Sequence, residues 1–253
     1  MSSDVVVFSQ SGDITRLTFN RPDKLNALSP DLIAQALALS EAVARSDARV
    51  LIVSGAGRAF SAGVDLAAVS SPDYTADAAR RFSDNARQLA LCWETAPQVV
   101  IAKVGGYCFT GGLELALACD FIVASDDAVF CDTHAKLGLR PAWGLSVRLP
   151  RRIGVQRARE MSFTARRVGA REAVTLGLIL DAVPAGDLEN RVAALADQII
   201  ANSRGSVAAY KELYGMSQNL PHDQGLKFEA RSSYPIADRR TRRSDVVASL
   251  RKS

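Results

Sequence analysis

The chain has 253 residues, of which 48% are hydrophobic and 23% charged, proportions that are ordinary for a globular enzyme with one large core. No apolar run approaches the about 20 residues that a membrane-spanning helix needs, and the N-terminus lacks the pattern of a secretion signal. The net charge of +4 is diffuse, with few aromatic residues between the basic ones, which argues against nucleic acid and membrane partners.

The first half of the chain predicts alternating strands and helices. A helix begins at Ser29-Pro30, because a capping hydroxyl followed by proline is typical of a first helical turn. Short continuous apolar runs are typical of strands covered on both faces. The predicted strands cover residues 5–8, 14–19, 49–54, 97–104 and 120–124, and the helices between them cover 76–93 and 112–119. This alternation predicts an α/β layer structure.

From about Trp143 the strand patterns vanish and helical segments follow one another. We therefore expect an α/β core over residues 1–190 and a helical C-terminal region over 191–253. The four cysteines form no C-x-x-C pair and lie beside apolar residues, so we expect reduced thiols and a cytoplasmic protein. With only two histidines in the chain, a His-rich metal site is not expected.

Two glycine-containing turns stand out, at residues 60–65 (FSAGVD) and 110–120 (TGGLELALACD). Each places a small residue where a backbone N–H can approach a ligand without a side chain in the way. Tight turns between packed elements are the alternative interpretation of either motif alone. A carboxylate, Glu114, follows the second turn within a predicted helix, and the combination suits the formation and quenching of an enolate.

Four stretches give the chain a clear resemblance to the enoyl-CoA hydratase/isomerase (crotonase) superfamily. They are NRPDKLNAL (20–28), GRAFSAGVDL (57–66), GYCFTGGLELALACD (106–120) and FCDTHAKLGLRPAWG (130–144). The resemblance implies a crotonase-like spiral of ββα repeats, a C-terminal helical trimerisation region, and homotrimers or dimers of trimers. It also implies an acyl-CoA substrate and no separate cofactor or metal, since coenzyme A is part of the substrate.

By the family pattern, the thioester oxygen lies between the N–H groups of Ala62 and Gly111, which form an oxyanion hole. The residues that border the substrate and its coenzyme A are then Lys24, Ala27, Ala62, Gly63, Val64, Asp65, Leu66 and Gly111. The chemistry agrees, because two preorganised N–H donors stabilise the negative charge that develops on a thioester oxygen.

Glu114 is the expected principal catalytic acid/base. It lies among apolar neighbours, where burial raises the pKa of a carboxyl group toward neutrality. The alternative is an exposed glutamate that only complements the helix dipole.

His134 marks a departure from the family. The two-glutamate hydratases carry a second glutamate twenty positions after the first, and His134 occupies that place here. Imidazole is a competent acid/base, so we expect His134 to assist Glu114. The alternative is that His134 only lines the acyl pocket or hydrogen-bonds to Asp132. Thr110 is a further departure, because a third glycine is common at that position.

The expected activity is hydration of trans-2-enoyl-CoA through an oxyanion-hole-stabilised enolate. A Δ3-Δ2 enoyl-CoA isomerase that uses Glu114 alone is the first alternative, and a non-catalytic acyl-CoA-binding homologue is the second. Aromatic and apolar residues that would line an acyl pocket, or belong to the plain core, are Tyr107, Phe109, Leu139 and Trp143. The sequence leaves the length and type of the acyl chain open.

Overall fold

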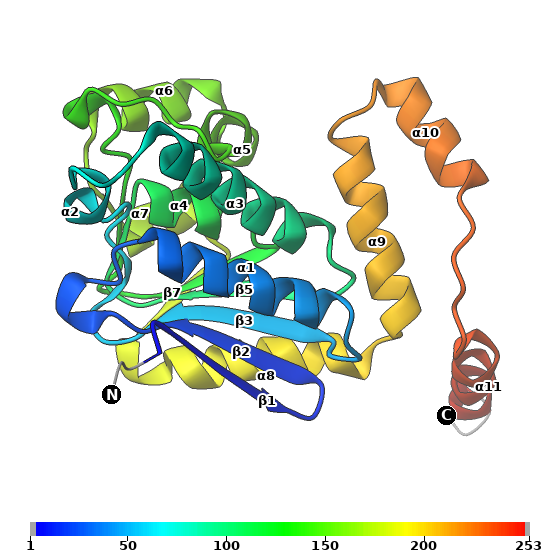
Figure 1. Cartoon of the computed structure of the whole chain (residues 1–253). Coiled ribbons are helices and arrows are strands. Elements are labelled where there is room, and N and C mark those ends of the chain that lie inside the picture. Colours follow the sequence, from blue (N-terminus) through cyan, green and yellow to red (C-terminus); the bar gives the residue numbers. More distant parts are fainter. Residues whose placement is uncertain (1–3, 251–253) are drawn as a thin grey trace.

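A six-stranded sheet in the order β1-β2-β3-β5-β7-β10 forms the centre of the protein, in a computed structural model that describes residues 4–250 (Figure 1). Its strands are β1 (Val6–Ser11), β2 (Ile14–Phe19), β3 (Val50–Gly55), β5 (Val99–Val104), β7 (Phe121–Ser125) and β10 (Asp181–Val183). Neighbouring strands run parallel, except for the antiparallel hairpin of β1 and β2.

A second, smaller sheet in the order β4-β6-β8-β9 lies beside the site described below. Its strands are β4 (Ala59–Ser61), β6 (Tyr107–Phe109), β8 (Val129–Cys131) and β9 (Val168–Gly169). The first three strands run parallel and β9 pairs with β8 in the antiparallel sense. The carboxyl ends of β4, β6 and β8 lead directly into the glycine turns and the segment that carries His134.

Helices cover both faces of the large sheet, which explains the continuous apolar runs of β3 and β5. The helices α1 (Pro30–Ala44) and α3 (Ala76–Thr95) pack together on one face, and α8 (Leu188–Ala201) contacts β3, β5 and β7 from the other (Figure 1). The remaining helices of the core are α2 (Leu66–Val69), α4 (Gly111–Ala116), α5 (Leu145–Ile153), α6 (Val155–Thr164) and α7 (Ala170–Thr175), with short 3-10 turns at Pro22–Lys24, Ala135–Leu137 and Ala185–Asp187.

Local capping fixes the start of α1 as the sequence predicts. The Ser29 hydroxyl accepts a hydrogen bond from the Leu32 amide at 3.2 Å, and Pro30 is the first helical residue. The fully buried Trp93 of α3 donates its indole N–H to Ser40 of α1 at 2.8 Å. This bond fixes the position of α3 along α1 and satisfies two polar groups that would otherwise be buried without partners.

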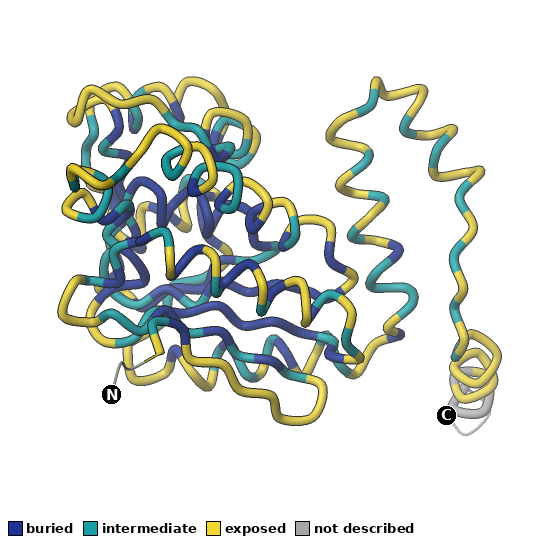
Figure 2. The backbone as a smooth tube through the Cα atoms, in the orientation of Figure 1, coloured by how far each residue is buried: buried dark blue, intermediate teal, exposed yellow. Residues whose placement is uncertain are grey.

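The last three helices form an arm beside the core (Figure 1). They are α9 (Arg204–Ser217), α10 (His222–Arg231) and α11 (Arg239–Leu250). Lys211 ties α9 to the core, because its ammonium donates to Trp93 O, Gln98 O and Asp120 Oδ2 at 2.7 to 2.8 Å. Beyond α9 most described residues are exposed (Figure 2).

The structure confirms the α/β class and the helical C-terminal region, and it corrects one prediction. Strands do not end at Trp143, since β9 and β10 follow it, and each is too short to leave a periodic pattern. The division of the chain at residue 190 stays a prediction; that boundary falls inside α8, whose Leu188, Val192 and Ala196 belong to the core on the sheet. In the described part of the chain, no helix combines the length and the apolar character needed to cross a membrane.

Candidate active site

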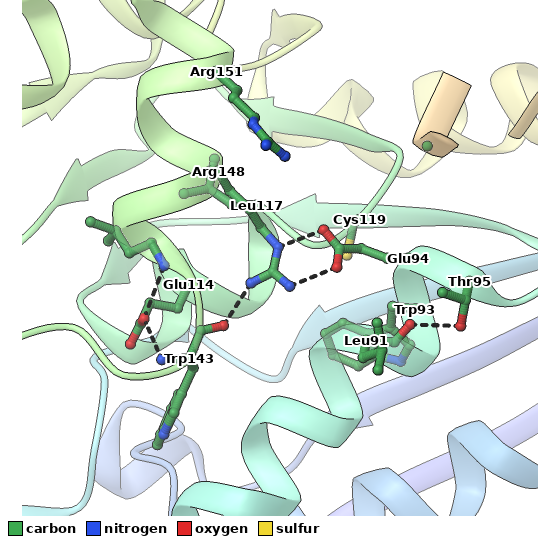
Figure 3. A network of polar contacts seen from close by, with 12 residues as sticks. Leu91, Trp93, Glu94, Thr95, Glu114, Leu117, Cys119, Trp143, Arg148 and Arg151 are labelled. Atoms are coloured by element: carbon green, nitrogen blue, oxygen red, sulfur yellow. Dashed lines mark hydrogen bonds and ion pairs between the residues drawn. The ribbon is translucent and has the colours of Figure 1, made fainter. Parts of the chain in front are cut away.

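Glu114 lies in the first turn of α4 and is 1% exposed. Its Oε1 atom accepts two backbone hydrogen bonds, from the amides of Trp143 at 2.9 Å and Leu145 at 3.1 Å (Figure 3). Burial raises the pKa of the Glu114 carboxyl group, and the two amides and His134 reduce this rise without cancelling it. A buried carboxyl group with a raised pKa is suited to give and take a proton.

His134 lies next to Glu114, as the sequence alignment of the family pattern predicts. Its Nε2 atom is 3.6 Å from Glu114 Oε2, and both side chains are buried. This separation is too long for a direct hydrogen bond, yet one water molecule could contact both atoms. The structure therefore brings together the two side chains that we expected to share the acid/base chemistry.

Asp132 orients the His134 ring. Asp132 Oδ1 is 2.6 Å from His134 Nδ1 and also accepts the His134 amide at 3.1 Å. Burial alone would raise the pKa of Asp132, but hydrogen bonds from His134 and Ser162 outweigh it and hold the pKa below its ordinary value. An ionised Asp132 places the ring proton on Nδ1, so that Nε2 of a neutral ring presents a lone pair towards Glu114.

Gly111 begins α4, and its amide belongs to the first turn, where N–H groups lack partners within the helix. A Cβ at this position would lie 2.7 Å from Trp143 Cζ3 and 3.3 Å from Leu28 Cδ1. The packing of Trp143 and Leu28 therefore requires a residue without a side chain at position 111. The close approach of a ligand to this amide stays a prediction.

The prediction that the Ala62 amide is an oxyanion-hole donor is wrong, because this amide already donates a hydrogen bond within the chain. Ala62 N–H donates to Leu25 O at 2.9 Å, in the loop that precedes α1. Two positions later the situation differs: among the described residues, no acceptor lies within hydrogen-bonding distance of the Val64 amide. Val64 pairs with Leu28 in an isolated parallel bridge that uses the flanking Gly63 carbonyl and Asp65 amide instead.

The turn of Gly63 and Val64 lies against the start of α4. A Cβ on Gly63 would lie 3.5 Å from the Gly111 nitrogen and 3.2 Å from Phe109 O, and its φ of +96° also favours glycine. Within the described part of the chain, Val64 and Gly111 thus each present an amide without an acceptor on neighbouring turns, the arrangement that the sequence predicted with Ala62. The sequence analysis placed Val64 among the residues that border the substrate but did not identify its amide as a donor. Sequence alone does not show which N–H group of a turn lacks an acceptor within the fold.

The remaining predicted substrate residues divide into two groups. Asp65 is buried, and its carboxylate stabilises the local structure. Arg21 Nη2 donates to Oδ2 at 2.6 Å, and the Ala68 amide donates to Oδ1 at 3.2 Å. Hydrogen bonding and the charge of Arg21 outweigh the effect of burial and lower the pKa of Asp65. Lys24 and Leu66 are exposed and Ala27 is half-buried, so these three border the surface beside the Gly63 turn.

Thr110 adopts a backbone conformation that favours glycine, with φ +50° and ψ −109°. Its hydroxyl group contacts the Thr133 hydroxyl and accepts the Thr133 amide at 3.3 Å. Thr110 thereby joins the start of α4 to the segment of Asp132 and His134, which accounts for a residue other than glycine at this position.

A cavity of about 400 Å³ opens beside His134 and Asp132. Its walls come from the segment after β8 and from α5 and α6, and are mainly apolar, including Leu139, Leu145, Leu149, Ala158 and Phe163. Of the four residues predicted to line an acyl pocket, only Leu139 borders this cavity. Trp143 is buried against Phe82, with ring centroids 5.3 Å apart, and the ring of Tyr107 contacts that of Phe109 in a tilted arrangement, with centroids 5.2 Å apart.

Comparisons with known proteins agree with this geometry. Residues 9–250 match the sequence model of the family described as "Enoyl-CoA hydratase/isomerase". A relative from Arabidopsis thaliana, named "Probable enoyl-CoA hydratase 1, peroxisomal", is 36% identical over 91% of this chain and 86% of its own length.

Two solved structures have the same fold over most of the chain. The enoyl-CoA hydratase from Bacillus anthracis has a TM-score of 0.86 at 32% identity and covers 90% of this chain and 88% of its own. A monofunctional enoyl CoA isomerase from M. smegmatis has a TM-score of 0.77 at 30% identity, over 91% of this chain and 100% of its own. The predicted crotonase-like fold is thereby confirmed.

Proposed function

Because the chain belongs to the enoyl-CoA hydratase/isomerase family, we propose that it is an enoyl-CoA hydratase that adds water to trans-2-enoyl-CoA thioesters. One observation carries the proposal: Glu114 Oε2 and His134 Nε2 face each other at 3.6 Å, both side chains are buried, and His134 borders an apolar cavity. Hydration needs a base for the water proton and an acid for the α-carbon, and these two groups supply both.

In the proposed reaction, the amides of Gly111 and Val64 bind the thioester oxygen. Charge grows on this oxygen when a nucleophile adds to C3, and the two N–H donors stabilise the resulting enolate. The N-terminus of the short helix α4 adds a partial positive charge near the same oxygen. The donor assigned by sequence to Ala62 is replaced by Val64, because the Ala62 amide already binds Leu25 O.

The Asp132–His134 pair acts as the general base. As the oxygen of water bonds to C3, its proton passes to His134 Nε2, while Asp132 stabilises the ring that becomes positively charged. Protonated Glu114 then donates its proton to C2 of the enolate, which forms the 3-hydroxyacyl thioester. Transfer of the proton from His134 back to Glu114 restores the starting protonation state of both groups. The net reaction is therefore the addition of one water molecule to the enoyl thioester.

Isomerisation of a 3-enoyl to a 2-enoyl thioester is the second candidate. Glu114 alone could move one proton between C4 and C2, with His134 as a passive wall, and the likeness to the M. smegmatis isomerase favours this alternative. The position of Asp132, which fixes the His134 tautomer, favours hydration, because a passive wall residue has no need of an ionised partner. A non-catalytic acyl-CoA-binding role is disfavoured by the retained Glu114 and its raised pKa.

The assembly and the location belong to the same proposal. The exposed surfaces of α9, α10 and α11 support the prediction of a homotrimer, alone or paired as a hexamer. All four cysteines are free, which supports a cytoplasmic location. The reaction as proposed requires no metal ion and no cofactor apart from the coenzyme A of the substrate.

Turnover of crotonyl-CoA, followed as loss of the absorbance of the conjugated enoyl thioester, tests the proposal. His134→Ala separates the two activities: hydration should fall by about 100-fold or more, while isomerisation of a 3-enoyl-CoA survives. Equal survival of both activities would reduce His134 to a wall residue and make the isomerase the better candidate. Absence of both activities in the wild type, with retained acyl-CoA binding, would favour the non-catalytic alternative.

A further inference from the structure

Arg148 forms a polar network behind the site (Figure 3). It extends from α5 and makes three hydrogen bonds through three nitrogen atoms. Nε and Nη2 bind the two carboxylate oxygens of Glu94 at 2.6 and 2.7 Å, and Nη1 binds the carbonyl of Trp143 at 2.6 Å. Glu94 lies in the last turn of α3, so the network joins α3 to the segment before α5.

The carbonyl that Arg148 binds belongs to the peptide between Trp143 and Gly144. This peptide lies between the two peptides whose amides, at Trp143 and Leu145, donate to Glu114 Oε1. A displacement of the central peptide that shifts its two Cα atoms would move both donors, because each flanking peptide shares one of these Cα atoms. Arg148 therefore holds the carbonyl side of the same short segment that holds Glu114 by its amides.

The Trp143 side chain is packed against Phe82, and Gly144 O accepts the amides of Val147 and Arg148, but the backbone at Gly144 is locally permissive. Gly144 has a φ of +113°, which favours glycine, and no side chain caps the start of α5. A Cβ on Gly144 would lie 2.1 Å from Arg148 Nη1, so the guanidinium group occupies the space that a side chain would need. The forked pair of Arg148 and Glu94 supplies a rigid, directional contact at a place where the backbone alone is permissive.

We propose that Glu94 and Arg148 are positioning residues, a clamp that holds the donors of Glu114 in place and thereby sets its orientation and proton affinity. The inference rests on the proposed function only in calling Glu114 the proton donor. Neither residue borders the cavity, and among the described contacts neither binds Glu114 itself. Arg148 is 15% exposed and Glu94 39%, so the clamp is shielded from water on one side.

A purely structural ion pair between α3 and α5 predicts something different. Its loss would lower the stability of the fold and leave the titration of Glu114 unchanged. Loss of a clamp would weaken the two hydrogen bonds that favour the ionised carboxylate, and so raise the pKa of Glu114 further. The titration of Glu114 itself therefore separates the two roles.

The experiment compares the wild type, R148Q and the control R191Q by infrared titration of the carboxyl band that disappears in E114Q. Arg191 forms an ion pair of similar length, 2.7 Å to Asp181, at the edge of the large sheet. We expect the pKa of Glu114 to rise by about one unit in R148Q, the size expected for weakening one or two hydrogen bonds, and to stay unchanged in R191Q. With crotonyl-CoA, kcat of R148Q should fall about tenfold or more while KM changes less than about threefold.

Two further variants keep the test decisive if R148Q folds poorly. Arg148→Lys keeps the charge but lacks the fork, so the pKa and kcat should lie between those of the wild type and R148Q. Adding Glu94→Gln to R148Q should cause no further change, because both act through one contact. A Glu114 titration in R148Q or R148K that matches the wild type and R191Q would overturn the clamp. Since the titration needs no turnover, this result is distinct from a failure of the proposed hydratase activity.

Discussion

Gly111→Ala tests the oxyanion hole through one added methyl group. The new Cβ would lie 2.7 Å from Trp143 Cζ3, about 0.7 Å inside the distance at which ordinary contact begins, and 3.3 Å from Leu28 Cδ1. Trp143 is buried and its amide holds Glu114, so the ring cannot move aside without disturbing the acid. We therefore expect the start of α4 to shift instead and to carry the Gly111 amide with it.

The expected effects follow from these contacts. Overpacking of this kind destabilises a fold by about 1–3 kcal/mol. Loss of one oxyanion donor lowers kcat by about 10²–10³, which corresponds to about 3–4 kcal/mol of transition-state stabilisation. If the wild type has an ordinary free energy of unfolding, G111A remains folded at the assay temperature. The fall in kcat should thus be larger than the loss of folded protein can explain.

Steady-state hydration of crotonyl-CoA and thermal unfolding measure both quantities for G111A and for a matched control, G205A. Gly205 is also crowded, because a Cβ there would lie 2.9 Å from Pro235 O, but it lies in the first turn of α9, far along the chain from the site residues. G205A should lose stability and keep its kcat. A G111A variant that is folded and retains kcat within about threefold of the wild type would refute the assignment of the Gly111 amide.

Two further predictions concern buried charges. The pKa of Glu114 is raised by burial, so the folded state binds its proton more tightly, and stability should fall as the pH rises from the unfolded pKa through the folded one. Urea unfolding between pH 4 and 8 should show that E114Q lacks this fall; an identical pH dependence in both proteins would contradict the raised pKa. Lys211→Met should remove about 3 kcal/mol of stability, because it leaves the half-buried Asp120 carboxylate without its ammonium partner. Urea unfolding should show partial recovery when Asp120→Asn is added, and no recovery would mean that Lys211 acts through its two carbonyl contacts instead.

The elements with long, regular patterns were predictable from sequence. The cap at Ser29, the apolar runs of β3 and β5 and the amphipathic pattern of α3 each report a local preference that the fold keeps. Short strands such as β9 and β10 were not predictable, because two or three residues carry no periodicity and pair only where distant segments meet.

The residues of the candidate site also divide into those that were predictable from sequence and those that were not. Glu114 was predictable from its apolar neighbours and His134 from the resemblance to the family, and the structure places them together. The free amide of the Gly63 turn was not, since Ala62 and Val64 differ only in which carbonyl the fold brings near them. The contact of Arg148 with Glu94 joins residues far apart in the sequence, and nothing local marks either as part of the site.

The rate of crotonyl-CoA hydration by Glu114→Gln, beside that of the wild type, tests the central claim most directly. Glutamine keeps the shape and can still accept the amides of Trp143 and Leu145, but it has no proton to give to C2. We predict that E114Q binds the thioester with unchanged affinity and that its kcat falls by about 10³ or more. An E114Q variant that hydrates crotonyl-CoA at the wild-type rate would contradict the account.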